Sequence, residues 1–283
     1  MTVRETAKAK INLDLRVCGR RADGYHDLDS IVVFTDFGDQ LFFTGADELA
    51  LSVEGPFADA LLQEQDNLIL RAARRLASSC QRSPNVHVTL EKHLPVAAGI
   101  GGGSADAAAA LRGLLRFWDL PMNIGDLNAI AVDLGADVPA CLGSHAVLMT
   151  GIGDGLTPFD LPQPQLILLV NPGEPVETRA IFSNLDKMSG ERPKAVATQT
   201  ADALLGYLGN SVNDLEVPAK QVAPIIDKVL QALSQQTGCK LARMSGSGAT
   251  CFGLFRDPQD LADAEKRLGE AYPGWWIVQS TCR

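Results

Sequence analysis

The chain has 283 residues, of which 46% are hydrophobic and 21% are charged, so it holds enough apolar material for one large domain or two modest ones. Its formal net charge is −9 and its pI is near 4.9. A phosphate backbone or an anionic membrane attracts clustered lysine and arginine, so the charge argues against nucleic acid and membrane as partners. A phosphorylated small molecule is not excluded, because it needs only a local cationic pocket.

The six cysteines include no CxxC pair, and several of them have apolar neighbours. This usage is typical of small buried side chains in a reducing compartment and not of a disulfide framework or a zinc site. The N-terminal residues lack the apolar core of a signal peptide, and the chain has no run of about 18 apolar residues. We therefore expect a cytoplasmic location.

Hydrophobic periodicity predicts alternating elements in the first half of the chain. Strands are expected at residues 11–17, 30–35, 40–44 and 86–90, and helices at residues 67–78, from the glycine-rich segment to Trp118, and from 126 to 134. Asp66 and Asp126 are the expected N-caps of two of these helices, and Gly135 is the expected stop of the last.

A second region begins near residue 160, with strands expected at 166–170, 240–244, 250–255 and 275–279. One helix is expected after Pro224, closed by Gly238, and another after Asp257. The resulting order, strand–helix–strand–strand–helix–strand, is typical of a ferredoxin-like split βαβ unit. Residues 183–201 are polar and broken by glycine and proline, which predicts a mobile segment.

The strongest local signal is the glycine-rich segment PVAAGIGGGSA, residues 95–105. Four glycines within five residues let the backbone approach a ligand without a Cβ in the way. The segment leads into an alanine-rich helix, whose unpaired N–H groups and positive dipole end favour an anion such as a triphosphate. The alternative, a tight turn without ligand, needs only one or two glycines.

Two other nucleotide-loop patterns do not fit this segment. No GxxxxGK[ST] motif is present, and no acidic residue ends a following strand as a dinucleotide fingerprint requires. Ser104 is the expected N-cap of the helix and a candidate ligand for Mg²⁺. Asp106 either complements the helix dipole or faces a metal ion. Lys92 either contacts phosphate or adenosine or is an exposed strand end.

Three shorter motifs carry further polar residues. Lys10 enters a strand in AKINL, Asp137 lies in GADVP, and SGSGA at residues 245–249 separates two strands. Because a proline disfavours helix at the preceding residue, Asp137 is expected in a short loop after a helix. Taken singly, the three motifs are a strand end, a turn aspartate and a flexible hairpin.

Together, these motifs and the glycine-rich segment resemble the GHMP kinases, the family of galactokinase, homoserine kinase, mevalonate kinase and phosphomevalonate kinase. The resemblance covers nearly the whole chain and implies an α+β fold of two domains. Residues 1–158 would form an N-terminal αβ domain like ribosomal protein S5, which binds the nucleotide. Residues 159–283 would form a C-terminal ferredoxin-like domain with a substrate-binding segment.

Finer features, such as GRRADGYHDLDSI and QDNLILRAA, resemble one branch of the family. They imply ATP-dependent phosphorylation, with Mg²⁺, of the tertiary 2-hydroxyl of a methylerythritol unit linked to cytidine diphosphate, in the non-mevalonate route to isoprenoids. A monomer or weak homodimer is expected. Two alternatives remain: another GHMP kinase, such as homoserine or phosphomevalonate kinase, and a catalytically inactive nucleotide-binding relative, which the presence of both Lys10 and Asp137 disfavours.

The resemblance also implies roles for individual residues. Lys10 and Asp137 would be catalytic, with Asp137 accepting the hydroxyl proton. The nucleotide would contact Asn67, Pro95, Val96, Ala97, Ala98, Gly99, Ile100, Gly101, Gly102, Gly103, Ser104, Ala105, Gly246, Ser247 and Gly248. The acceptor would contact Asn12, Tyr25, His26, Thr178 and Phe182, of which the aromatic residues would surround cytosine or, alternatively, fill the core or a turn. Ala105-Asp106 departs from the Ser-Asn of some relatives and leaves metal binding by Asp106 open.

Overall fold

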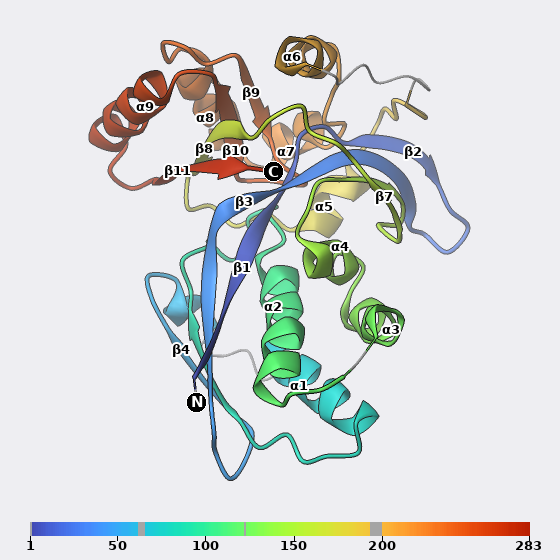
Figure 1. Cartoon of the computed structure of the whole chain (residues 1–283). Coiled ribbons are helices and arrows are strands. Elements are labelled where there is room, and N and C mark those ends of the chain that lie inside the picture. Colours follow the sequence, from blue (N-terminus) through green and yellow to red (C-terminus); the bar gives the residue numbers. More distant parts are fainter. Residues whose placement is uncertain (1, 62–65, 122, 193–199) are drawn as a thin grey trace. The chain divides into compact units, whose positions relative to one another are not determined.

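The computed structural model describes residues 2–61, 66–121, 123–192 and 200–283 (Figure 1). They form two compact units that interleave along the chain. Unit 1 contains residues 1–10, 38–96 and 101–144, and unit 2 contains residues 11–37, 97–100 and 145–283. Two strands, β1 (Val3–Asn12) and β3 (His26–Thr44), pass from one unit into the other. The division after residue 158 stays a prediction about sequence domains.

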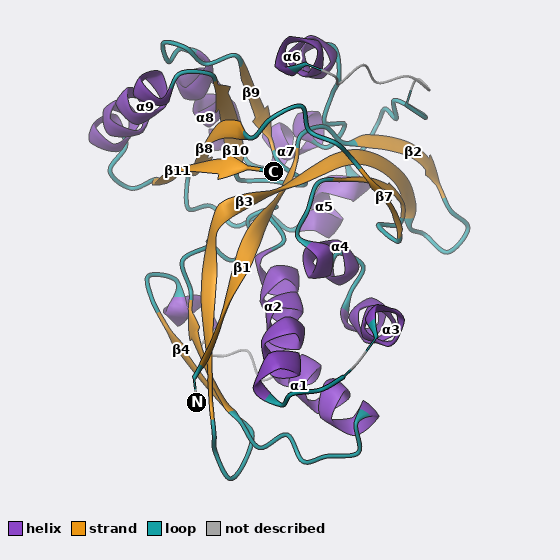
Figure 2. Cartoon of the chain, viewed as in Figure 1, coloured by secondary structure: helices purple, strands orange, loops and turns teal. Residues whose placement is uncertain are grey.

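Unit 1 combines a small mixed sheet with helices. The second half of β3 pairs antiparallel with β5 (His87–Glu91), and β4 (Ala50–Glu54) pairs parallel with β5. The helices of this unit are η1 (Ala58–Leu61), α1 (Leu68–Ser79), α2 (Gly102–Phe117), α3 (Ile124–Leu134) and α4 (Val138–Gly143). Helices α1 and α2 pack side by side on one side of the strands (Figure 2).

Helix α2 is the central helix of unit 1. Its buried residues are mostly alanines, and short side chains let neighbouring elements approach it closely. Gly113 shows how tight this packing is, because a Cβ at that position would lie 2.2 Å from Cε2 of the buried Phe43 ring. The alanine-rich sequence therefore fits a helix that contacts α1, α3 and α4.

Unit 2 contains two antiparallel sheet regions. In the first, β3 pairs with β2 (Arg16–Arg20) and with β6 (Val147–Gly151), which also pairs with β7 (Gly155–Pro158). In the second, the order is β11 (Trp276–Cys282), β8 (Gln165–Asn171), β10 (Cys251–Phe255) and β9 (Leu241–Met244). Helices α8 (Ile225–Ser234) and α9 (Pro258–Ala271) contact this second region.

The second region confirms the predicted ferredoxin-like unit, in which β8, α8, β9, β10, α9 and β11 follow the expected order. Its core combines the inner faces of these strands with α8 and α9, including Leu168, Val170, Val229, Leu233 and Leu261. Three further helices, α5 (Thr178–Ser183), α6 (Ala201–Gly209) and α7 (Glu216–Val222), lie between β8 and α8 in the chain and were not predicted.

Several predicted boundaries are wrong. The strand expected at 11–17 is β1, which ends at Asn12, followed after a break by β2. The strands expected at 30–35 and 40–44 are one continuous strand, β3. It continues through the polar residues between them because Gly38 lies against the backbone of Ala7, where a Cβ would be 2.0 Å from the carbonyl oxygen. Helix α8 ends at Ser234, before Gly238.

Two predicted N-caps are also wrong. Asn67, not Asp66, caps α1 by accepting a hydrogen bond of 2.9 Å from the N–H of Ile69. Asn123, not Asp126, caps α3, and the N–H of Asp126 donates to its side chain. Asparagine and aspartate cap helices about equally well, so the sequence around each start could not select between neighbouring polar residues.

Within the part of the chain that the structure describes, no helix is long and apolar enough to cross a membrane. The segment expected to be mobile, 183–201, includes residues 193–199, which lie outside the described residues. Its described part contains the end of α5, the residues up to Arg192, whose side chain is buried, and residues 200 and 201 at the start of α6.

Candidate active site

The glycine-rich segment ends in the N-terminus of α2, as predicted, but the cap is not Ser104. Gly101 is the N-cap and takes a left-handed conformation with φ of 64°, which glycine adopts without strain. The helix therefore begins three residues earlier than a serine cap would allow, and Ser104 lies in its first turn. No side chain caps this turn, so the amides of its first residues are available to an anion.

Lys10 and Asp137 are in direct contact, although 127 positions separate them in the sequence. Lys10 Nζ donates to Asp137 Oδ1 over 2.8 Å, and the two side chains are 6% and 37% exposed. Lys10 comes from β1, and Asp137 lies between α3 and α4, in the short loop that was expected. Val138 is helical despite the following proline, because proline is tolerated in the first turn of a helix.

The end of the glycine-rich segment lies against this ion pair. A Cβ at Gly101 would be 3.1 Å from Cβ and 3.3 Å from Cε of Lys10. The lysine side chain thus packs directly against the backbone at the start of α2, within unit 1. The segment and the charged pair, found as separate motifs in the sequence, form one cluster.

A second buried cluster, centred on Lys92, lies next to Gly102 at the start of α2. Lys92 is 2% exposed, and its Nζ lies 2.6 Å from both Asp39 Oδ2 and Asp106 Oδ2. The exposed strand end considered for Lys92 is therefore wrong. Burial lowers the pKa of Lys92, but the two carboxylates outweigh it and hold that pKa above its ordinary value. Burial also raises the pKa of Asp106 to about 8, with Lys92 opposing the rise and Asp39 adding to it.

The first part of the glycine-rich segment belongs to unit 2 and packs on the turn after β9. A Cβ at Gly99 would lie 2.6 Å from both the amide nitrogen of Gly248 and the carbonyl oxygen of Ser245. Ser245 Oγ donates to the Gly99 carbonyl over 3.1 Å. The Gly246 residue likewise has a positive φ of 54°, and a Cβ there would lie 2.7 Å from the Gly99 oxygen. Gly99 and the turn at residues 245–248, which belong to the predicted phosphate cradle, are therefore closely packed against each other within unit 2.

Two buried side chains that sequence reasoning did not select hold this arrangement in unit 2. Ser245 Oγ accepts from the N–H of Asn12 over 3.2 Å. Asn213 donates from Nδ2 to the carbonyls of Met244 and Gly246, each over 2.8 Å. Ser245 stood in the SGSGA motif and could have been found there, but nothing around Asn213 in the sequence signals its role.

Two predicted acceptor contacts lie near the same turn. Asn12 Nδ2 donates to Ser30 Oγ over 2.7 Å and is buried. Thr178, the first residue of α5, shares a hydrogen bond of 2.8 Å with Ser247. Asn12 and Thr178 thus both contact the turn that contains Ser245 and Ser247, within unit 2.

The predicted aromatic residues are only partly together. The rings of His26 and Phe182 stack with centroids 4.9 Å apart and planes 23° from parallel. Tyr25 is 63% exposed, and its amide donates to Asp23 within the turn after β2. Burial, helped by the charge of Arg20, lowers the pKa of His26, so its ring is neutral at pH 7 and suited to stacking. All three residues belong to unit 2.

Asn67 has a structural role that was not predicted. As the N-cap of α1, its side-chain oxygen is engaged with the N–H of Ile69. Its contact with adenine stays a prediction, in which the side-chain NH₂ group is the part that would face the base. Of the remaining segment residues, Val96, Ala97 and Gly103 are exposed, whereas Pro95, Ala98, Ile100 and Ala105 are buried.

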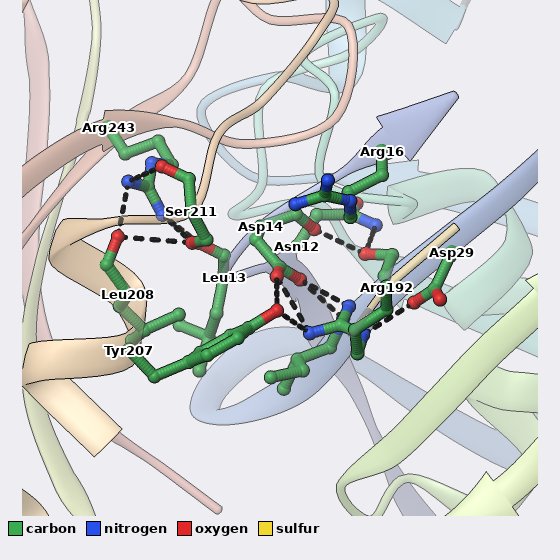
Figure 3. Close-up of polar contacts among 12 residues, drawn as sticks. Asn12, Leu13, Asp14, Arg16, Asp29, Arg192, Tyr207, Leu208, Ser211 and Arg243 are labelled. Atoms are coloured by element: carbon green, nitrogen blue, oxygen red, sulfur yellow. Dashed lines mark hydrogen bonds and ion pairs between the residues drawn. The ribbon is translucent and has the colours of Figure 1, made fainter. Parts of the chain in front are cut away.

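A buried network that sequence reasoning missed surrounds the end of β1 in unit 2 (Figure 3). Arg192 donates to both oxygens of Asp14, over 2.9 and 3.0 Å, and to Asp29 over 2.7 Å. Tyr207 also bonds to Asp14 and Arg192. On the other side of the strand, Arg243 donates to the carbonyl of Leu13 over 2.9 Å. The network thus holds Leu13 and Asp14, the two residues that directly follow Asn12.

A helix start without a capping side chain lies beside an ion-paired lysine, on an α+β scaffold with a ferredoxin-like sheet, which agrees with the resemblance to the GHMP kinases. Family models for the GHMP kinases match here: the one for the N-terminal domain covers residues 67–145, and the one for the C-terminal domain covers residues 194–274. The chain belongs to the GHMP kinase family.

Its relatives include proteins named 4-diphosphocytidyl-2-C-methyl-D-erythritol kinase. The one from Rhodospirillum rubrum is 49% identical over 277 residues, which cover 97% of this chain and 91% of that protein. The one from Parvibaculum lavamentivorans is 49% identical over 283 residues, which cover 98% and 97% of the two chains.

Solved structures agree with this relationship. A crystal structure of 4-(cytidine 5'-diphospho)-2C-methyl-D-erythritol kinase superposes with a TM-score of 0.82 at 29% identity, covering 99% of this chain and 98% of the other. Homoserine kinase from Cytophaga hutchinsonii superposes with a TM-score of 0.71 at 17% identity, covering 99% and 94% of the two chains. The second likeness shows a shared fold alone.

Replacing Arg192 with methionine should destabilise the protein by roughly 3–5 kcal/mol, because the buried Asp14 and Asp29 carboxylates would lose their cation. The matched control is Arg256→Met, which removes an ion pair with the exposed Asp202 and should cost about 0–1 kcal/mol. Urea unfolding followed by circular dichroism measures both. Equal losses for the two variants would show that the network does not stabilise the fold.

Proposed function

We propose that this chain transfers the γ-phosphate of ATP to the 2-hydroxyl of 4-diphosphocytidyl-2-C-methyl-D-erythritol, the substrate that the names of its relatives specify. The observation that carries the proposal is the 2.8 Å contact of Lys10 with Asp137 beside Gly101. A carboxylate, an ammonium group and free amides at a helix start are the groups that phosphoryl transfer to an alcohol requires.

In the proposed mechanism, Asp137 accepts the proton of the acceptor hydroxyl. Its carboxylate is partly exposed and so accessible to a substrate, while one of its oxygens bonds to Lys10. The Lys10 ammonium orients that carboxylate and lowers the energy of negative charge forming on the hydroxyl oxygen. A tertiary alcohol is a crowded nucleophile of high pKa, so both a base and a nearby cation favour its attack.

The nucleotide would lie along the glycine-rich segment. Its phosphates would accept hydrogen bonds from amides at the start of α2, which no side chain caps. Because Gly99, Gly101 and Gly246 have no Cβ, the backbone at these positions can lie close to its neighbours. Residues 95–105 and 246–248 would form the predicted cradle. Asn67 would contact adenine.

Magnesium is part of this proposal, and the residues of the chain fit an ion carried mainly by the nucleotide. Among the described residues, no three His, Cys, Asp or Glu side chains converge as a metal site. Ser104 offers a hydroxyl in the first turn of α2, whereas Asp106 already bonds to Lys92. Mg²⁺ often takes few protein ligands together with substrate phosphates. When bound, it would neutralise charge that develops on those phosphates.

The acceptor would use residues of unit 2. The stacked pair of His26 and Phe182 with the exposed Tyr25 would bind cytosine, and Asn12 and Thr178 would contact the methylerythritol or phosphate part. The proposal also includes a cytoplasmic location, which the six free cysteines support, and a monomer or weak homodimer as the working state.

Phosphorus NMR of the product tests the function directly. With ATP and the diphosphocytidyl acceptor, we expect ADP and a new phosphomonoester signal on the methylerythritol unit. Homoserine and phosphomevalonate serve as competing acceptors, because kinases for them share the fold. If either alternative acceptor is turned over faster than the diphosphocytidyl acceptor, the proposed substrate is wrong. If ATP is consumed with none of the three acceptors, the chain is an inactive relative.

Replacing Asp137 with asparagine should lower kcat by roughly 10²-fold or more, because the proton acceptor is lost. Affinity for ATP should stay largely unchanged. The matched control is Asp133→Asn on α3. The Asp133 carboxylate pairs with the exposed Arg75, so this substitution should not affect turnover. Steady-state kinetics with saturating ATP provide the measurement, and unchanged kcat in the Asp137 variant would refute the assignment.

Replacing Tyr25 with alanine should weaken binding of the cytidine acceptor far more than binding of ATP. Loss of one stacking partner is worth about 1–3 kcal/mol, which corresponds to a rise of about five- to more than a hundredfold in the acceptor KM. The control is Tyr272→Ala, which removes a tyrosine stacked on Trp275. Equal losses for acceptor and ATP would contradict a cytosine pocket at Tyr25.

A further inference from the structure

Three buried titratable residues of unit 1, Asp39, Lys92 and Asp106, form a cluster that we call the loop anchor. The Lys92 ammonium lies 2.6 Å from an oxygen of each aspartate. Asp39 comes from β3, Lys92 follows β5, and Asp106 lies on α2. One ammonium group therefore ties together three elements of unit 1.

The loop anchor holds the chain just before the glycine-rich segment. Asp39 Oδ1 accepts hydrogen bonds from the amides of His93 and Leu94, over 2.6 and 2.8 Å. These residues immediately precede Pro95. The carboxylate thus uses one oxygen for the Lys92 ammonium and the other for the backbone that enters the segment.

The same cluster holds the chain just after the segment. Asp106 is on the second turn of α2, and its Oδ2 accepts from Lys92. The start of this helix is also close to the ammonium, because a Cβ at Gly102 would be 3.3 Å from Lys92 Nζ. Residues 95–101 are therefore fixed at both ends by one side chain.

The contacts and burial of the loop anchor argue against Lys92 as a phosphate ligand. Its ammonium already bonds to the carboxyl groups of two aspartates and is 2% exposed, so a phosphate would have to displace them. In addition, Asp106 Oδ1 is buried without a hydrogen-bond partner among the described residues. Burying such an oxygen costs stability, so Asp106 is not the side chain that would make this cluster most stable.

We propose that Lys92 and Asp106 are positioning residues, which fix the distance between the two ends of the glycine-rich segment and so preset its amides for a triphosphate. The inference rests on the proposed nucleotide site. A segment with four glycines has many accessible conformations, and fixing one of them costs conformational entropy. If the amides already point toward the ligand site, the ligand binds without that entropy cost.

Asp106→Ala separates this proposal from direct phosphate contact by Lys92. If Lys92 bound phosphate, removing a carboxylate that competes for it would leave ATP affinity unchanged or make it stronger. If the loop anchor positions the segment, the same variant weakens ATP binding by roughly tenfold or more, because amides that are out of position lose most of their interaction with the phosphates. Asp106→Asn should restore most of the affinity, because its amide oxygen can still accept from Lys92.

The experiment is calorimetric titration of ATP into the full chain and the two Asp106 variants, with Asp133→Ala as an exposed control that should bind like the parent. Hydrogen–deuterium exchange of residues 93–104 without nucleotide gives a second readout, in which Asp106→Ala should exchange faster and Asp106→Asn should not. If Asp106→Ala does not fold, Asp106→Ser, too short to reach Lys92, takes its place.

Each outcome separates the inference from the function on which it rests. ATP binding by Asp106→Ala that equals or exceeds that of the parent overturns the positioning role, as does unchanged exchange in residues 93–104. Failure of the parent chain to bind ATP instead refutes the proposed nucleotide site, while the exchange data still decide whether the loop anchor orders the segment.

Discussion

The structure depends on one constraint, the close approach of the backbone of residues 99–102 to its neighbours. At Gly99 the space of a Cβ is filled by backbone of the turn after β9, and at Gly101 it is filled by the side chain of Lys10. Any larger residue would push the segment away from these partners. The same lack of side chains leaves amides at the start of α2 without a side-chain cap, so the tight packing and the proposed anion site have a common cause.

In both units, buried cations are matched by aspartate side chains. Lys10 faces Asp137, Lys92 faces two aspartates, and Arg192 faces two more. A buried ion pair contributes little net stability, but removing one partner leaves an unpaired charge at high cost. Ion pairs of this kind therefore fix the positions of the elements that carry them more than they add to the stability of the fold. In the proposed site, only the Lys10 pair is accessible enough to act on a substrate, whereas the other two are enclosed.

Membership of the GHMP kinases and the identity of this chain's substrate rest on different observations. The ferredoxin-like order of β11, β8, β10 and β9 is a property of the fold, and it is compatible with several acceptor alcohols. In the proposed site, side chains such as His26 and Phe182, which stack in unit 2, would select the acceptor. Near 49% identity along the whole chain to named kinases supports one acceptor among those that the fold allows.

The sequence alone determined the features that arise from neighbouring residues. The glycine run, the alanine-rich helix and the alternating strands of the ferredoxin-like unit depend on local backbone preference and periodicity, and the motifs around Lys10 and Asp137 carried the family resemblance. Only the tertiary structure decided which distant groups meet. Lys92 bonds to Asp39 across 53 positions, and Arg192 bonds to Asp14 across 178. Such partners are selected by burial, which no local pattern records, because a charged side chain looks the same in sequence whether solvent or a carboxylate surrounds it.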